Sequence, residues 1–431
     1  MGSVFRLIYL KRFFRAIREE GVGTALRKAV FWTKFFLGGA APSGFIARRY
    51  GVSSGYYLGG IWRDLAERQS FDASRNFKPK TPKVVVIGDL NLPQCKKYRV
   101  AQLSELFEIK GWQFDYSSIG DAPRAAELLQ DATHLILYRV LMGKALSEVL
   151  YEARRLGIPV LYDIDDPLFS ISAYATYENM KALPERLAVH FMDEAPKYAL
   201  AMNACDMVSV STPRLAEFAR RYVMRPVVVR RNFADRSTLA ACPAPESTPA
   251  EAGVFRMGFA TGSQGHEMDL AVVADALAEF LSRAPGRKLM LIGQVNQKFI
   301  PEDLLPYCEF EPFTDYETYL AVLAKCDVVL LPLTDDMFNQ SKSAVRALDA
   351  AAVARPVIAS DVSDQKHFVL DGKTGILVSQ GQSWLTALEQ MAKDPTFCNA
   401  MGRAARANLT ENWAAMDREP VAGADFWDFF S

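Results

Sequence analysis

The chain has 431 residues, more than one hydrophobic core usually serves, so two domains are expected. Apolar residues make up 50% and charged residues 23%, as in a folded globular protein, which excludes a disordered or fibrous chain. The six cysteines are scattered, without a C-x-x-C pair or neighbouring histidines, which argues against a zinc site and a disulfide framework and fits a reducing cytoplasm.

The net charge of zero is unevenly distributed along the chain. Residues 1–80 contain 15 Lys and Arg against 5 Asp and Glu, a net charge of +10, so the remaining 351 residues carry −10. No stretch has the length and continuity of a transmembrane helix, and no signal peptide is recognisable. We expect a cytoplasmic protein with a separate basic module at residues 1–80.

Two segments of this basic module have the pattern of amphipathic helices. In the first, Leu7, Phe13 and Ile17 fall on one side of a helix and basic residues on the other, and residues 24–37 repeat the pattern. Such helices can lie at the inner face of the cell membrane, with aromatic side chains among the acyl chains and cations on anionic headgroups. We therefore predict membrane contact through residues 1–40. Packing on the chain itself or on a partner protein is the alternative, and nucleic acid is disfavoured because of the many aromatic residues.

From residue 83 onward, short apolar runs alternate with helices. The predicted strands of the first series are KVVVIGD, QFDYSSI, THLILY, IPVLYDI, MVSVST and PVVVRRN, and those of the second are FRMGFA, KLMLIGQ, DVVLLPL, RPVIASD and TGILV. The pattern predicts parallel sheets covered by helices on both faces. The predicted parts are a first Rossmann-like domain (81–236), a linker rich in Pro, Ala, Ser and Thr (237–253), a second Rossmann-like domain (254–400), and C-terminal helices (401–431) that cross back to the first domain.

Ligands of such sheets bind beyond the carboxyl ends of the strands, in a cleft. The chain lacks G-x-G-x-x-G after the first strand, a G-x-x-x-x-G-K-[ST] loop and a G-x-S-x-G elbow. These absences disfavour a nicotinamide oxidoreductase, a P-loop nucleotidase and an α/β-hydrolase.

The stretch from Ser341 to Asp361, SKSAVRALDAAAVARPVIASD, predicts a helix followed by a buried strand. We expect the helix to begin near Lys342 with Ser341 or Ser343 as its N-cap, which would form an anion site suited to a diphosphate. Arg346 and Asp349 share a face with Lys342, and Asp349 could accept hydrogen bonds from ribose hydroxyls. The alternative is a solvated helix face on which Arg346 and Asp349 pair.

The segment FNQSKSAVRALDAAAVARPVIASD resembles the donor-binding segment of GT-B glycosyltransferases of family 4, in particular the group 1 enzymes of bacterial surface-polysaccharide synthesis, written F-N-x-x-K-S-x-x-K-x-L-E-Y-A-A and G-x-P-V-I-A-S. Asn339, Lys342 and Ser343 match that pattern, whereas Asp349 stands for the usual Glu and Ala354 for the usual Gly. The resemblance implies that the helix opens toward the diphosphate of a nucleotide sugar. It also implies that the carboxylate inside the helix binds the ribose.

The segment GFATGSQGHEMDL resembles the turn that opens the second domain in this family. Gly262 allows the backbone to approach a ligand closely, and Ser263 and His266 offer hydrogen bonds. The alternative for His266 is an ordinary helix-capping role. With these residues the predicted donor site is complete, and it needs no metal or other cofactor.

In the first domain, Tyr98 and Arg99 match the C-x-x-Y-R pattern of the family and are predicted to steady an anionic group or the acceptor across the cleft; a surface Arg on a helix is the alternative. The sequence LYDIDDPLF places three carboxylates within four residues, which repel one another unless a cation or ligand hydroxyls lie among them. We predict that Asp165 or Asp166 contacts the transferred sugar or the acceptor. The D-x-D spacing from residue 163 is taken as a coincidence rather than a metal motif.

Together, the resemblance and the residues predict a retaining, nucleotide-sugar-dependent glycosyltransferase that acts on a glycan or lipid-linked acceptor in cell-surface polysaccharide synthesis. Lys342, Arg346 and the helix amino end would stabilise charge on the departing diphosphate. Two alternatives remain open from the sequence: a sugar-nucleotide epimerase of the same architecture, and a catalytically inactive relative that serves as a binding subunit.

Overall fold

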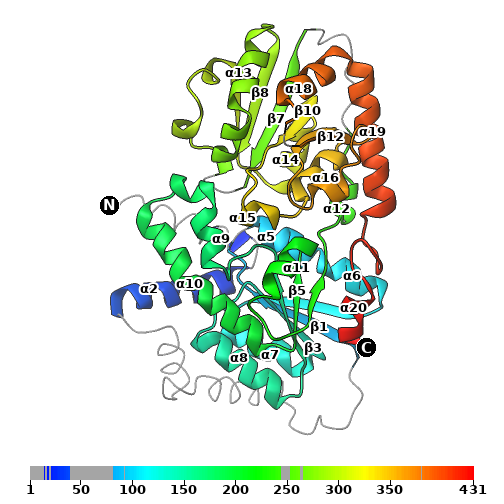
Figure 1. Ribbon diagram of the computed structural model, residues 1–431. Helices are drawn as coiled ribbons and strands as arrows, with labels where there is room; N and C mark the ends of the chain where they lie inside the picture. The colour runs from blue at the N-terminus through cyan, green and yellow to red at the C-terminus, as the bar shows by residue number, and fades with distance from the viewer. Residues whose placement is uncertain are drawn as a thin grey trace. The chain divides into compact units, whose positions relative to one another are not determined.

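The computed structural model describes residues 21–38, 81–91, 93–243, 253–262, 266–379 and 381–431, together with positions 14, 17 and 18 (Figure 1). Most of the basic module and part of the predicted linker therefore lie outside the described residues. Within the module one helix is described, α2 (Val22–Gly38), where the second amphipathic segment was predicted. None of the helices in the described part of the chain is long and apolar enough to cross a membrane.

The strands form two six-stranded sheets, and the second contains one strand more than was predicted. The first has the order β2-β1-β3-β4-β5-β6 and the second the order β12-β11-β10-β7-β8-β9. The strands of the first sheet are β1 (Lys83–Gly88), β2 (Gln113–Ser118), β3 (His134–Tyr138), β4 (Val160–Ile164), β5 (Met207–Val210) and β6 (Val227–Val229). Those of the second are β7 (Phe255–Thr261), β8 (Arg287–Gly293), β9 (Cys308–Pro312), β10 (Val328–Leu331), β11 (Val357–Ser360) and β12 (Gly375–Val378). The strand pairs run parallel.

Helices alternate with these strands, as the pattern predicts. Their bounds are α7 (Ala122–Asp131), α8 (Lys144–Arg155), α11 (Pro213–Ala219), α13 (Ala274–Ser282), α14 (Tyr316–Leu323), α16 (Val345–Ala352), α17 (Gln365–Phe368), α18 (Trp384–Lys393), α19 (Pro395–Asn412) and α20 (Ala424–Trp427). The short α12 (Arg236–Leu239) occupies the beginning of the predicted linker. The connection from β1 to β2 contains a short α5 (Pro93–Cys95), a π-helix η2 (Lys96–Ala101) and α6 (Leu103–Ile109).

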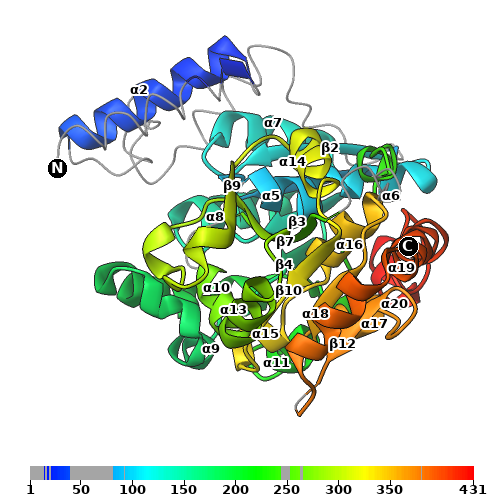
Figure 2. The same ribbon diagram turned by 90° about the horizontal axis from the view of Figure 1, so that it is seen from above.

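Apolar side chains are buried on both faces of the second sheet. In β10, Val328 and Leu330 belong to one buried cluster, and Val329 and Leu331 to another. Helices α13 and α18 cover the first cluster and lie side by side (Figure 2), whereas α14 and α16 cover the second. Because successive strand residues point to opposite faces, burial on both faces requires the continuous apolar runs seen in the sequence.

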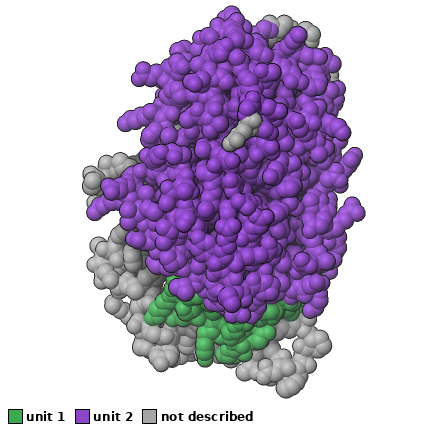
Figure 3. All heavy atoms as spheres, viewed as in Figure 1, with its two compact units in different colours: residues 1–90, 112–160 green, residues 91–111, 161–431 purple. Residues whose placement is uncertain are grey.

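The chain divides into two compact units (Figure 3). One consists of residues up to Leu90 with Trp112–Val160, and the other of Asn91–Gly111 with Leu161–Ser431. All contacts of the candidate site described below lie within the second unit.

The residue that follows α16 has an unusual backbone conformation, and a substitution there can test its energetic cost. Ala354 follows this helix with φ 55°, in the left-handed region. The Ala354 and Arg355 N–H groups donate to the Ala351 and Ala350 carbonyls, a Schellman arrangement in which glycine is favoured. Ala354→Gly is therefore expected to raise the free energy of unfolding by about 1 kcal/mol, measured by urea unfolding. Ala352→Gly, inside the helix, is the control and should lower it; a destabilising Ala354→Gly would contradict the prediction.

Candidate functional site

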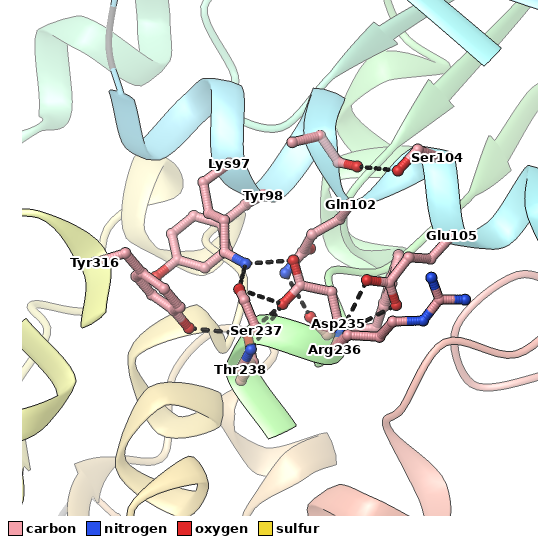
Figure 4. Close-up of polar contacts among 12 residues, drawn as sticks. Lys97, Tyr98, Gln102, Ser104, Glu105, Asp235, Arg236, Ser237, Thr238 and Tyr316 are labelled. Carbon is pink, nitrogen blue, oxygen red and sulfur yellow. Dashed lines mark hydrogen bonds and ion pairs between the residues drawn. The ribbon is translucent and has the colours of Figure 1, made fainter. Parts of the chain in front are cut away.

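Three consecutive residues of the π-helix η2 each contact a different carboxylate. Lys97 bonds to Asp235, and also to Ser237, just before and within α12 (Figure 4). Tyr98 donates from its hydroxyl to Asp349 Oδ2 at 2.7 Å, and Arg99 donates to both oxygens of Asp163, at 3.0 and 2.5 Å. The π-helix η2 thus contacts a strand of the first sheet, the connection after β6, and the helix α16 that covers the second sheet.

The alternative of a surface position for Arg99 is wrong, whereas its contact with an anionic ligand stays a prediction. The side chain is fully buried, and besides Asp163 it donates to the Arg230 carbonyl at 2.8 Å and to Asn232 Oδ1 at 3.1 Å. Its guanidinium is thus held by protein groups. Burial raises the pKa of Asp163, but Arg230 and Arg99 more than offset this and hold that pKa below its usual value. Asp163 lies in β4, and the chain's own Arg99 and Arg230 supply the positive charge that its carboxylate requires.

Asp349, predicted to bind a ribose, is buried among tyrosines. Its Oδ2 accepts from Tyr98 and its Oδ1 from the Tyr316 hydroxyl at 2.8 Å. Tyr316 lies at the start of α14, and its ring is edge-on to that of Tyr98. Burial raises the pKa of Asp349 to about 6.

This raised pKa predicts how stability depends on pH. Since an unfolded Asp has a pKa of about 3.9, the folded state disfavours ionisation of Asp349. Stability should therefore fall as the pH rises from about 4 through about 6, by roughly 2 to 3 kcal/mol from this group. Asp349→Asn removes the titration. Urea unfolding measures the free energy of unfolding of the wild type and of this variant at pH 4.5 and pH 7. The difference between the two proteins should decrease from pH 4.5 to pH 7, and a difference independent of pH would contradict the prediction.

The prediction that the donor-binding helix begins near Lys342 is wrong. A short helix, α15 (Met337–Gln340), comes first, and α16 begins only at Val345, with Ala344 as its N-cap and no side-chain cap. Ser341 Oγ instead donates to the Met337 carbonyl, and Ser343 Oγ accepts from Asn232. Lys342 and Ser343 thus lie in the turn between two helices.

Asn339 belongs to α15 and is fully buried. Its backbone N–H and its Nδ2 both donate to Asp336, the N-cap of α15, at 2.9 and 2.8 Å. Among the described residues its Oδ1 has no partner. Asn339 therefore fixes the turn that carries Lys342, and only its Oδ1 remains to meet a ligand.

Lys342 is enclosed by aromatic rings and carboxylates. Its Nζ donates to the Tyr177 hydroxyl at 2.9 Å and lies 4.9 Å from the centre of that ring, which stacks on Phe338 with centroids 4.2 Å apart. Burial lowers the pKa of Lys342 and Arg346 lowers it further, while Asp269 and Asp166 act in the opposite direction. A diphosphate placed here would meet two cations.

His266 and Asp269 lie in η5 (His266–Val272), a 3-10 helix, and the charge of Lys342 acts on both side chains. His266 Nδ1 lies 3.4 Å from Asp269 Oδ2. Burial, with the charge of Lys342, lowers the pKa of His266 to about 4, so the imidazole is neutral at pH 7. Burial raises the pKa of Asp269, but Lys342 and His266 more than offset this, and the carboxylate stays ionised.

The remaining predicted residues differ in how closely they approach this cluster. Gly262 accepts from Gln94 Nε2 through its carbonyl, and a Cβ there would lie 3.4 Å from that nitrogen, so space is tight. Asp165 and Asp166 follow β4 and are half-buried; the charge of Asp166 acts on Lys342. Ser263 lies outside the described residues. No group of three or more metal-ligating side chains occurs in the part of the chain that the structure describes.

Two residues of the cluster were missed from the sequence. The long connection from β4 to β5 contains α9 (Ile171–Thr176), η3 (Glu178–Ala182) and α10 (Glu185–Ala204), and it brings Tyr177 and Asn179 to Lys342 and Asp269. The available signal was the length of this connection, which is far beyond the usual few residues plus one helix.

Comparison with known proteins gives this geometry a family context. Residues 257–394 match the family described as glycosyl transferases group 1. The D-inositol 3-phosphate glycosyltransferase of Corynebacterium diphtheriae is 37% identical over 169 residues, 35% of this chain and 38% of that protein. The glycogen synthase of Mycobacterium tuberculosis is 27% identical over 157 residues, 35% of this chain and 36% of that protein. The matches thus span less than two fifths of these relatives.

Similar solved structures include sucrose-phosphate synthase from Thermosynechococcus elongatus, with TM-score 0.52 and 14% identity over 81% of this chain and 96% of that one. A glycosyltransferase from Rickettsia africae has TM-score 0.53 and 12% identity over 78% and 95%. The Anabaena protein HepE, solved with UDP and glucose, has TM-score 0.50 and 15% identity over 78% and 96%. The chain has the GT-B fold, and its residues 257–394 are similar to group 1 glycosyl transferases.

Proposed function

We propose that this protein is a retaining glycosyltransferase that moves a sugar from a nucleotide-sugar donor to a glycan or lipid-linked acceptor in cell-surface polysaccharide synthesis. The observation that carries the proposal is the cationic turn at Lys342, inside the region similar to group 1 glycosyl transferases and beside the amino end of α16. Arg346 adds a second positive charge near this turn. Two cations and a helix amino end suit a diphosphate better than a neutral ligand.

The residues divide the work of the proposed reaction. Lys342 and Arg346 stabilise the negative charge that develops on the departing diphosphate, which is electrostatic catalysis by the chain's own groups. Neutral His266 offers a hydrogen bond to the donor. Asp349 accepts hydrogen bonds from the ribose hydroxyls, which replace the tyrosine hydroxyls that donate to it in the structure. Asp165 or Asp166 contacts the transferred sugar or the acceptor.

A panel of nucleotide sugars tests this proposal. Purified protein is titrated calorimetrically with UDP-, GDP- and dTDP-sugars, and turnover is followed with and without candidate glycan and lipid-linked acceptors. The expected result is binding of one donor and transfer that depends on an acceptor. Absence of both binding and turnover would overturn the proposal, and so would conversion of the donor to an isomeric nucleotide sugar without an acceptor.

We further propose that residues 1–40 hold the enzyme at the inner face of the cell membrane. In α2, Val22, Leu26 and Val30 recur every four residues and are 58%, 51% and 45% exposed, an apolar stripe on one helix face. Flotation with anionic liposomes should be lost when residues 1–80 are removed. Equal flotation of the full and shortened chains would overturn this part of the proposal.

A further inference from the structure

The hydroxyl proton of Tyr177 has no acceptor among the residues that the structure describes. Its oxygen accepts two N–H donors, Lys342 Nζ and Asn179 Nδ2, each at 2.9 Å, which occupies both of its acceptor positions. Burial raises the pKa of Tyr177 well above its usual value, so the proton stays in place. Within the described residues no hydrogen-bond acceptor for it is found. The O–H group is therefore available to an incoming oxygen atom.

Asn179 shows the complementary deficit. The residue is 4% exposed, and its Nδ2 donates to Asp269 Oδ1 at 3.0 Å as well as to Tyr177. Its Oδ1 has no hydrogen-bond partner among the residues that the structure describes. An unpaired buried acceptor costs free energy unless a ligand supplies a donor.

The positions of both groups are fixed without a ligand. The Tyr177 ring is nearly parallel to that of Phe338, at an interplanar angle of 6°, and Asn179 is anchored to Asp269 of η5. Groups held in place before binding lose little freedom when a ligand arrives. The pair is built as a receiving surface rather than as a mobile lid.

A ligand that completes both groups has to bring an acceptor oxygen to Tyr177 and a hydroxyl donor to Asn179, next to two cations. We propose that Tyr177 donates to a phosphate oxygen of the nucleotide-sugar donor, and that Asn179 Oδ1 accepts from a hydroxyl of the transferred sugar. Asn179 is then a specificity-determining residue, since a donor sugar without that hydroxyl leaves its Oδ1 unpaired. This inference rests on the proposed function.

The test compares a nucleotide sugar with its own nucleoside diphosphate. The tightest-binding nucleotide sugar of the panel and its nucleoside diphosphate are titrated into the wild type, Asn179→Ala and Tyr177→Phe. Asn179→Ala should weaken binding of the nucleotide sugar about tenfold, the value of one hydrogen bond, and leave that of the nucleoside diphosphate within about twofold. Tyr177→Phe keeps the ring on Phe338 and should weaken both ligands about five- to tenfold.

Glu178→Gln is the matched control, because Glu178 lies between the two residues and its exposed side chain pairs with Lys181. It should change neither affinity. If Asn179→Ala lowers the thermal midpoint, Asn179→Ser, which keeps a polar side chain but lacks the amide oxygen, should show the same split between ligands.

An equal effect of the Asn179 variants on both ligands, or none, would overturn the sugar contact. Unchanged affinities in Tyr177→Phe would overturn the phosphate contact. Failure of the wild type to bind any nucleotide sugar would instead refute the proposed function itself, and this inference with it.

Discussion

Asp163→Asn is expected to lower the free energy of unfolding by about 3 to 5 kcal/mol. The substitution hardly changes the shape of the side chain, so the effect is electrostatic. It leaves Arg99 and Arg230, both almost fully buried, without the carboxylate that pairs with them at 2.5 and 3.0 Å. Burial, with the repulsion of Arg99, already lowers the pKa of Arg230 to about 10.

Urea unfolding followed by tryptophan fluorescence measures this effect. Asp417→Asn is the matched control, because Asp417 also pairs with a cation, Lys110, but at an exposed position. It should change stability by less than about 1 kcal/mol. Similar small values for both variants would mean that the two arginines do not depend on Asp163.

Lys342→Ala is expected to weaken nucleoside diphosphate binding by about 10- to 100-fold. A charge-assisted hydrogen bond contributes about 1.5 to 3 kcal/mol, and Arg346 with the helix amino end remains. The fold should be retained, because the substitution also removes the free-energy cost of burying the charged ammonium group, and this offsets the contacts that are lost. Calorimetric titration with the diphosphate, alongside circular dichroism, separates the two effects.

Lys181→Ala provides the comparison for Lys342. Lys181 is exposed and paired with Glu178 on η3, so its removal deletes one positive charge in the same part of the chain. Its diphosphate affinity should stay within about twofold of the wild type. Equal affinities of Lys342→Ala and the wild type would remove Lys342 from the site.

The sheets were largely predictable, because continuous apolar runs such as KVVVIG and VVLL are what a strand covered on both faces requires. The edge strand β9 was missed, since CEFEP has no apolar run and only half-buries its residues. The start of α16 was misplaced for a different reason. Ser341 and Ser343 have good capping side chains, but tertiary partners, the Met337 carbonyl and Asn232, occupy them.

Within the site, the sequence identified residues better than their surroundings. Lys342 and His266 were predicted in the donor site and Asp165 or Asp166 at the transferred sugar or the acceptor, and electrostatic effects connect Lys342 with His266 and Asp166 in the structure. The burial of Arg99 could not be foreseen, because its partners lie 64 to 133 positions away along the chain. Tyr177 and Asn179 were invisible for the same reason, as no local pattern distinguishes a tyrosine that will meet a lysine 165 residues later.

The three contacts of the π-helix also have a consequence for how the protein is made. The carboxylates that hold Arg99, Lys97 and Tyr98 are 64, 138 and 251 residues further along the chain, respectively. A growing polypeptide therefore leaves the ribosome with these side chains unpaired, and the last of them acquires its partner only after Asp349 has emerged. Domains usually fold one after another during synthesis. The contacts of η2, however, are complete only after residues of both domains have emerged from the ribosome. Pausing of translation before Asp349 should leave it open to proteases, and resumed synthesis should protect it.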